Sequence, residues 1–386
     1  MLELFFQNLV ERSSNLANIL FGGSYGWVKL AFFSVFASFF FAFPSYDVML
    51  KGDSDYNWAS VVERAREPFT KKNYPPRSHQ EKTELRLTGP IIGNLLGLER
   101  PGFLALQIIF LVVFFLVLTK ILWQLSSDVP SMTFLSLAFG TIFVGNVLVS
   151  DIRGFFDVIA FTFLILAMCW KSPAIIFVAT FLASFTDERG FLATSLVFLY
   201  WIVKEHDVTS LNIRSLVRGN WYSWAVVLSG IMYLGARFVL FKLLGLSTPS
   251  SDGGLWLAID QINAWAFGLW TGLEGVWLIV IAAAIILFIS KRYSFLTALI
   301  AFSGGIIVVA VSVIDITRSM AYVFPIALIS VVIVEKTEKH LSRYLYFAAM
   351  LISFLPSYYV SSENNIMMSY PFLLQMLRLL RTSLIG

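Results

Sequence analysis

Residues 103–123, FLALQIIFLVVFFLVLTKILW, form an apolar run that carries one charge, Lys120, and one amide, Gln107. A helix needs about 20 mainly apolar residues to cross the hydrocarbon core of a bilayer, so this run has the length of a span. The composition agrees: 58% of the residues are hydrophobic, 13% are charged, and the mean hydropathy is +0.78. Soluble domains carry about 25% charged residues. The sequence therefore predicts an all-α, polytopic membrane protein.

Similar apolar runs recur along the chain and predict about eleven transmembrane helices. They lie at residues 28–44, 103–123, 131–149, 155–170, 172–186, 190–204, 221–243, 275–290, 294–314, 319–335 and 343–360. The multi-span domain is thus expected over 27–360. Residues 1–26 mix apolar with charged side chains, as an interfacial helix does. The tail, 361–386, is expected to be interfacial or an additional span.

Two longer connections interrupt the apolar runs. Residues 45–102, the first, carry much of the charge of the chain and are expected to contain short helices, one of them stopped by Pro68. Residues 246–273, the second, contain Trp256, Trp265 and Trp270, which suit a helix at the level of the lipid headgroups. Both connections are predicted to lie on the outer face.

The lysines and arginines of the short loops predict the orientation, because such residues concentrate on the cytoplasmic side. With a cytoplasmic N-terminus, the inner loops carry Lys171, Lys204, Arg214, Arg218, Lys291, Arg292, Lys336, Lys339 and Arg343. The outer short loops then carry only arginines that have an acidic residue within three positions. We expect an integral protein of a plasma membrane, such as the bacterial inner membrane.

Every acid–arginine grouping at a helix end falls on the predicted outer face. The residues concerned are Asp151 and Arg153, then Asp187, Glu188 and Arg189, then Asp315 and Arg318, with Arg237 inside a nearby apolar run. Ionisable groups at membrane depth are costly and are retained mainly for pairing or function. Any one pair could be a cap or an interfacial salt bridge, and Arg237 could extend to the headgroups. The set as a whole favours one shared polar site.

The residues that would indicate other classes of protein are absent or scattered. Cys169 is the single cysteine, and His79, His206 and His340 fall in three separate segments, so the sequence predicts no disulfide and no metal site. No glycine-rich phosphate loop is present. The net charge of +4 fits basic cytoplasmic loops, and no nucleic-acid partner is expected. No cofactor is assigned, and assistance by a divalent cation stays open.

An outer polar site of carboxylates and arginines suits one kind of chemistry. A carboxylate can take the proton of an attacking hydroxyl as a general base. Arginine can hold a phosphate leaving group with two parallel hydrogen bonds and stabilise its developing charge. This combination points to transfer from a phosphate-linked donor to a hydroxyl acceptor. A lipid-linked donor would also explain why the protein is embedded in membrane lipids.

The stretch Asp53-Ser54-Asp55-Tyr56-Asn57-Trp58-Ala59, just after the first predicted span, resembles the acidic-aromatic signature of the GT-C superfamily. These are multi-span glycosyltransferases that use polyprenyl-phosphate sugars on the outer face. The resemblance implies that Asp53 is the catalytic base, with Asp55 as the alternative because the match leaves the register open. It also implies that Tyr56 and Trp58 contact substrate.

Two further stretches carry the resemblance, which covers about the first 200 residues. Asn73-Tyr74-Pro75-Pro76 is similar to a Pro-Pro that follows in the same loop of the family, and residues 157–191 are similar to its later spans. The resemblance implies transfer of one sugar from an undecaprenyl- or dolichyl-phosphate carrier to a glycan, lipid or protein, as in polysaccharide biosynthesis of the cell envelope. It leaves open whether the transfer inverts or retains.

Several other functions compete with this interpretation. A transporter or flippase would use charges near the bilayer midplane and paired broken helices, which the sequence does not display. A polysaccharide polymerase or ligase would be expected to have a late outer loop rich in Arg and His, and residues 246–273 contain neither. An acyltransferase would need a well-placed histidine. A non-catalytic assembly protein would use the first polar connection for docking.

Overall fold

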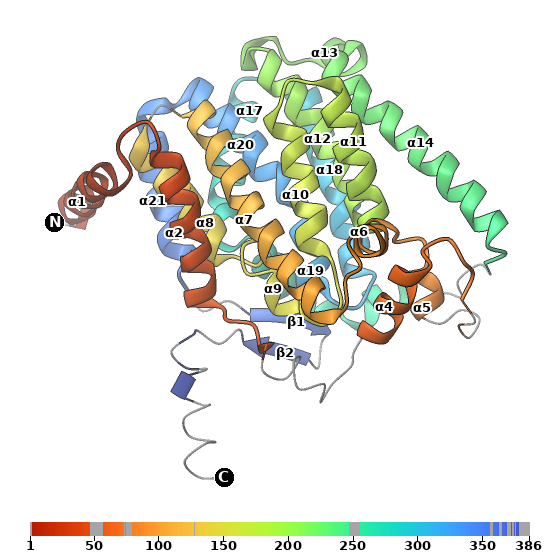
Figure 1. Cartoon of the computed structure of the whole chain (residues 1–386). Coiled ribbons are helices and arrows are strands. Elements are labelled where there is room, and N and C mark those ends of the chain that lie inside the picture. The colour runs from red at the N-terminus through yellow and green to blue at the C-terminus, as the bar shows by residue number, and fades with distance from the viewer. Residues whose placement is uncertain are drawn as a thin grey trace.

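The computed structural model describes residues 2–46, 57–72, 74, 79–126, 128–246, 255–355, 358–362, 365–368, 372, 374, 376 and 377. These residues form a bundle of helices whose axes run roughly side by side (Figure 1). The prediction of a helical protein is confirmed. The short elements gather at the two ends of the bundle. We call the end with α4, α5 and β1 the loop end, and the opposite end the α13 end.

The centre of the bundle consists of helices that bury half or more of their apolar residues. They are α7 (Arg100–Leu125), α10 (Asp157–Cys169), α12 (Glu188–Glu205) and α20 (Pro325–Thr337). α10 packs on α7, and α12 packs on α20. Continuous apolar sequence allows this, because a helix that is apolar all round can be covered from every direction. Proline in the first turn, as in α7 and α20, starts a helix without loss of a backbone hydrogen bond.

Further helices cover this centre on both sides. On one side lie α2 (Gly26–Phe41), α8 (Val129–Thr141) and α21 (Lys339–Ser353). On the other lie α11 (Pro173–Thr186), α14 (Trp221–Leu243), α17 (Trp277–Ile289) and α18 (Tyr293–Val311). α2 packs on α7 and α8, and α14 packs on α11 and α12. α14 leans away from the bundle toward the loop end (Figure 1).

Among the described residues, five helices are long and apolar enough to cross a membrane, or six if the bent pair of α1 and α2 counts as one span. The five are Arg100–Leu125, Trp221–Leu243, Ile262–Ile289, Tyr293–Val311 and Ile316–Thr337. The predicted count of eleven is not confirmed. α8, α10 and α11 contain 13, 13 and 14 residues. At 1.5 Å per residue they extend for about 20 Å, short of a hydrocarbon core of about 30 Å.

The outer surface of the bundle is rich in exposed apolar side chains. Examples are Phe36 on α2, Ile231 and Phe238 on α14, and Ile300 on α18, each more than half exposed. A water-soluble monomer rarely exposes large contiguous apolar areas. This surface is compatible with an integral membrane protein.

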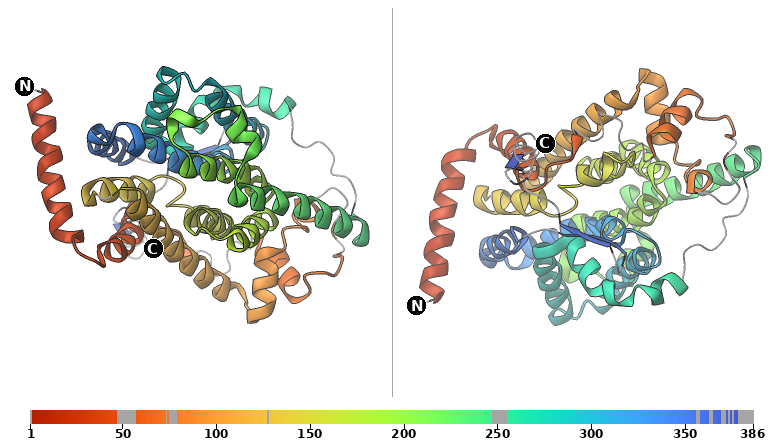
Figure 2. Two further views of the ribbon diagram at one scale, coloured as in Figure 1. Left: turned by 90° about the horizontal axis from the view of Figure 1, so that it is seen from above. Right: turned by 90° about the horizontal axis from the view of Figure 1, so that it is seen from below.

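The N-terminal helix α1 (Leu2–Phe21) projects sideways from the bundle and meets α2 at an angle of 110°. The views along the bundle axis show it at one flank of the bundle (Figure 2), where it packs on α8. Val10, Ala17 and Phe21 are buried, whereas Leu4 and Ile19 are exposed. The helix therefore has one apolar face against the bundle and another that is exposed, and the interfacial location expected over 1–26 stays a prediction.

The loop end is built from short elements. They are α4 (Trp58–Arg66), α5 (His79–Lys82), α6 (Thr88–Leu96), α9 (Leu148–Asp151) and α19 (Ile316–Met320), with η3 (Ala321–Val323). Trp58 anchors the first connection here. It is fully buried, packs against Phe103 and Phe156, and donates from Nε1 to the carbonyl of Ile152 at 2.8 Å. The α13 end carries η1 (Val208–Ser210) and α13 (Ile213–Arg218).

Two predictions about the later part of the chain need correction. The span expected over 343–360 ends as α21 at Ser353, and an antiparallel hairpin follows, β1 (Tyr358–Ser362) with β2 (Asn365–Met368). Tyr358, Tyr359 and Val360 favour strands, so the apolar character that suggested a helix belongs to a strand. Within 246–273, α15 (Leu255–Asp260) precedes α16 (Ile262–Leu273), which continues through η2 (Glu274–Val276) into α17 as one apolar element.

Candidate functional site

Asp157 is the centre of a buried polar cluster at the loop end. It begins α10, where the positive end of the helix dipole favours a carboxylate. Its side chain is 1% exposed. Tyr322 donates its hydroxyl to Asp157 at 2.6 Å, and Arg318 forms an ion pair with the same carboxylate. Both partners come from the segment α19–η3, about 160 residues later, so the cluster joins distant parts of the chain.

The junction between α11 and α12 supplies the second carboxylate, Asp187. It caps α12 by accepting from the backbone N–H of Arg189 at 2.9 Å. The guanidinium of Arg189 holds both oxygens of Asp187, each at 2.7 Å. Arg86 adds a third contact at 2.7 Å. Burial acts to raise the pKa of Asp187, but Arg189 and Arg86 outweigh it and hold the pKa well below its ordinary value.

Glu188 extends the cluster toward the surface of the bundle. It accepts from Arg86 at 2.9 Å and from Arg237 of α14 at 3.1 Å. Arg237 also donates to the hydroxyl of Tyr233, one turn earlier on α14, at 2.8 Å. The side chains of Arg86 and Arg237 are 24% and 30% exposed, so this edge of the cluster meets the outside.

Asp315 ties the C-terminal hairpin to the cluster. Its φ of 71° places a non-glycine residue in the left-handed region, which is uncommon and costs conformational energy. The hairpin holds it there: Ser361 donates its hydroxyl to Asp315 at 2.8 Å, and the Asp315 N–H donates to the Ser361 carbonyl at 2.7 Å. Arg318 lies 3.8 Å from Asp315 and stacks on the ring of Phe155.

We call these residues the ion network. Its carboxylates are Asp157, Asp187, Glu188 and Asp315, and its guanidiniums are Arg86, Arg189, Arg237 and Arg318. The formal charges balance. A phosphate can therefore bind only where an arginine has unused N–H groups or gives up a carboxylate.

A narrow cavity beside the ion network has a volume of about 20 Å³, room for about one water molecule. It is lined by Asn57, Ser60, Arg64, Thr83, Arg86, Gly154, Phe155, Phe156, Thr186, Asp187 and Arg318. Arg64 is buried and donates to the carbonyls of Ser60 and Thr83. Within the described residues no ion pair joins it to a carboxylate. Burial lowers the pKa of Arg64 to about 10, so it stays a cation at neutral pH.

The structure brings together six of the side chains that the sequence singled out. Asp187, Glu188, Arg189, Arg237, Asp315 and Arg318 all belong to the ion network. Asp151 lies beside it and is fully buried, but it does not line the narrow cavity. Arg153 and Trp58 fasten the start of α4, because the Arg153 carbonyl accepts from the Asn57 N–H at 3.3 Å. Asp53, Asp55 and Tyr56 lie outside the described residues.

Four residues of this site were not predicted from the sequence. Asp157 begins an apolar run and looked like the start of a span, and Tyr322 lies within another. Arg64 and Arg86 belong to the charged first connection, where nothing distinguishes a buried arginine from a solvated one. An acidic residue at the start of an otherwise uncharged helix is the sequence signal by which Asp157 could have been predicted.

The described residues contain no group of three or more His, Cys, Asp or Glu side chains arranged to hold a metal ion. The nearest arrangement, the carboxylates of the ion network, is occupied by arginines. Comparison of the chain with protein families, with curated proteins and with solved structures found no match. The function therefore has to be argued from the site itself.

Asp157 offers a test of the ion network. Replacing it by alanine leaves Arg318 and Arg189 with fewer carboxylate contacts in a buried place, and breaking a buried pair costs about 3–5 kcal/mol. We expect Asp157→Ala to lower the free energy of unfolding in mixed detergent micelles by about that amount. Asp260→Ala, at an exposed position of α15, is the matched control. Equal stability of the two variants would contradict a central role for Asp157.

Asp151 predicts a dependence of stability on pH. Burial, and next the charge of Asp157, raise its pKa well above the ordinary value. The folded protein then retains a proton that the unfolded chain releases. The stabilisation that this protonation contributes is complete below about pH 4 and is lost as the pH rises. Asp151→Asn, which resembles the protonated acid, should unfold at a higher temperature than the unmodified protein at about pH 7.5. A thermal midpoint that falls in this variant would refute the assignment.

Proposed function

We propose that this protein is a membrane glycosyltransferase that moves a sugar from a polyprenyl-phosphate carrier to a hydroxyl acceptor. The observation that carries the proposal is an apolar groove of about 520 Å³ whose lining residue Leu234 lies one turn before Arg237, at the exposed edge of the ion network. An apolar chain and a phosphate could occupy these two adjoining places at once. Asn57, within the acidic stretch 53–59, lines the narrow cavity beside the ion network.

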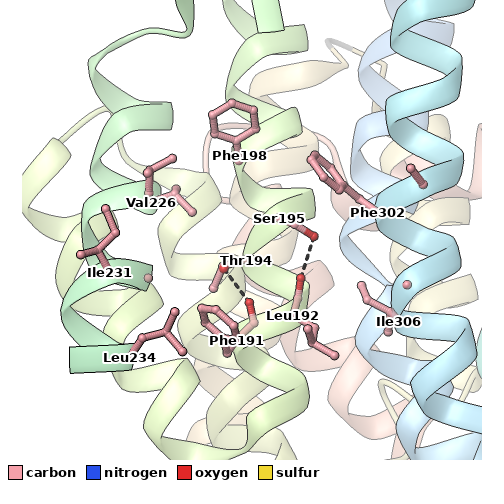
Figure 3. A pocket seen from close by; sticks show the side chains of 14 residues that line it. Phe191, Leu192, Thr194, Ser195, Phe198, Val226, Ile231, Leu234, Phe302 and Ile306 are labelled. Carbon is pink, nitrogen blue, oxygen red and sulfur yellow. Dashed lines mark hydrogen bonds between the residues drawn. The ribbon is translucent and has the colours of Figure 1, made fainter. Parts of the chain in front are cut away.

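The groove lies between three helices, with α12 in contact with both α14 and α18 (Figure 3). Its lining is almost wholly apolar and comprises Phe191, Leu192, Thr194, Ser195, Phe198, Val226, Val227, Gly230, Ile231, Leu234, Ala301, Phe302, Gly305 and Ile306. The hydroxyls of Thr194 and Ser195 donate to carbonyls of their own helix, so they present little polarity to the groove. This lining suits an isoprenoid chain.

One aromatic contact joins the groove to the ion network. Phe191 lines the groove near the start of α12, and its ring lies 5.0 Å from that of Tyr233. Tyr233 accepts a hydrogen bond from Arg237. Arg237 and Arg86 both form ion pairs with Glu188. A lipid whose tail fills the groove would thus bring its phosphate to Arg237 and Arg86.

The geometry changes which arginines we propose for the phosphate. Arg189 and Arg318 are engaged by Asp187 and Asp157 and are 10% and 5% exposed. They support the walls of the site. Arg86 and Arg237 stand at its edge, and Arg64 faces the narrow cavity without a paired carboxylate among the described residues. The guanidiniums of Arg86 and Arg237 can receive a phosphate and stabilise its charge as the bond to the sugar breaks. The narrow cavity at Arg64 has room for about one water molecule, so Arg64 would act on the phosphate only through its charge.

The base is proposed to come from Asp53, with Asp55 as the alternative. Asn57 lines the narrow cavity and is held by its N–H bond to Arg153. Asn57 follows Asp55 by two positions and Asp53 by four, so chain length alone keeps their Cα atoms within about 7 Å and 14 Å of it. We therefore propose that one of the two carboxylates takes up the proton of an acceptor hydroxyl beside the narrow cavity as the hydroxyl attacks the sugar.

The proposed base is tested by Asp53→Asn and Asp55→Asn, with Ser54→Ala as the matched control in the same stretch. Loss of a general base typically costs about 10²–10⁴-fold in rate. We expect one aspartate variant to lose glycan product by such a factor in a deletion strain that depends on the introduced gene. Membrane insertion, checked by immunoblot, should be equal in all three. Full activity of both aspartate variants would exclude this stretch as the source of the base.

The groove offers an independent test through neighbouring glycines of α18. Gly305 lines the groove, Gly304 does not, and a Cβ added to either meets no atom within 4 Å. Gly305→Leu should fill the groove and displace part of an isoprenoid chain, which weakens binding by about tenfold. Gly304→Leu should bind normally. Native mass spectrometry with undecaprenyl phosphate measures both, and equal binding by the two variants would contradict the proposed location of the tail.

A further inference from the structure

A second cavity lies at the α13 end of the bundle, far from the ion network. Its volume is about 570 Å³, within the range of about 300–1,000 Å³ typical of ligand sites. It is lined by Gln124, Leu125, Cys169, Trp170, Lys171, Lys204, Val332, Glu335 and Lys336. The proposed transfer makes no use of these residues. We call this cavity the lysine pocket.

Three lysines line the lysine pocket, Lys171, Lys204 and Lys336, and a fourth, Lys120, lies over the ring of Trp170 in its wall. Lys336 donates to the carbonyls of Val203, Lys204 and His206 at 2.8–3.0 Å and thereby neutralises the C-terminal end of α12. The contacts of Lys336 are the ordinary structural role of lysine at a helix end. Lys171 pairs with Glu205 at 2.8 Å but remains 56% exposed, so other N–H groups of its ammonium can still bind an anion.

Lys204 and Lys120 are different. Lys204 Nζ donates to the Tyr200 hydroxyl at 3.0 Å and lies 5.0 Å from the centre of the Trp201 ring. Lys120 Nζ lies 4.7 Å from the centre of the Trp170 ring. Neither forms an ion pair with a carboxylate in the part of the chain described by the structure. Both ammonium groups can therefore accept an anion without giving up a counter-charge.

Trp170 indicates where the lysine pocket opens. Tryptophan concentrates at the boundary between hydrocarbon and water, where its ring is apolar and its N–H is polar. Trp170 is half-buried, lines the pocket and follows directly on the last residue of α10. The pocket thus opens at the level of the lipid headgroups. The carboxylate of Glu335, which also lines the pocket, repels an anion and can accept a hydrogen bond from a hydroxyl.

We propose that the lysine pocket binds a phosphorylated polyol, with the phosphoryl group at Lys204 and Lys171 and a hydroxyl at Glu335. Two sources offer this chemistry: the headgroup of an anionic phospholipid and a soluble phosphate ester. The charge of the walls favours such a ligand, because the lining holds three lysines and one glutamate, Glu335. The site is independent of the sugar transfer proposed for the other end of the bundle.

The test compares Lys204→Gln and Lys171→Gln with Lys29→Gln, an exposed lysine of α2 outside the pocket. Phosphatidylglycerol in nanodiscs, counted by native mass spectrometry, probes the lipid source, and glycerol 3-phosphate in titration calorimetry probes the soluble one. We expect one probe to bind about tenfold more weakly to each pocket variant than to the control, since each loses a charge-assisted hydrogen bond. The probe that responds identifies the source.

Lys204→Arg separates a ligand contact from a merely structural effect. Arginine keeps the positive charge and the donors, so this variant should retain most of the binding that Lys204→Gln loses. Size-exclusion profiles in detergent should be the same for all variants. If neither probe distinguishes the pocket variants from Lys29→Gln, the proposal is overturned. Loss of binding in Lys204→Arg as severe as in Lys204→Gln would also overturn the role of the charge.

Discussion

A charge surrounded by apolar helices must meet an opposite charge, and the loop end of this bundle depends on that requirement. The pair of Asp157 and Arg318 joins α10 to α19, and the pair of Asp187 and Arg189 fixes the turn from α11 into α12. Tyr322 and Arg86 complete the coordination of the two carboxylates. Because these contacts link segments that are distant in the sequence, the elements around them can hardly move independently.

Such pairs are a weak source of stability, since removing two charges from water costs about as much as their attraction returns. A well-packed apolar core would hold the same helices together without them. We therefore attribute their presence at one end of an apolar bundle to the proposed chemistry rather than to folding. The exposed edge formed by Arg86 and Arg237, next to an apolar groove, is the feature on which we base the proposal of an amphiphilic, phosphate-bearing substrate.

The sequence predicted the helical character well, because runs such as 103–123 and 221–243 have no other stable form in lipid. The number of membrane spans was predicted less well. Hydropathy does not distinguish a helix that crosses a bilayer from a short one such as α10, which other helices cover on nearly every side. For the candidate site, adjacent charges such as Asp187, Glu188 and Arg189 stood out. Asp157 and Arg86 acquire their roles only through contacts across the fold, which local sequence does not encode.

The shortness of α10 has an electrical consequence. Its 13 residues extend for about 20 Å, with Asp157 at one end and Trp170 and the lysine pocket just beyond the other. With the lysine pocket at the headgroup level of a bilayer whose hydrocarbon core is about 30 Å, Asp157 is recessed by about 10 Å from the opposite surface. The insulating layer at the centre of the bundle is then thinner than the lipid around it. A transmembrane voltage would fall across that shorter distance, and the local field between the two sites would exceed that in the surrounding bilayer.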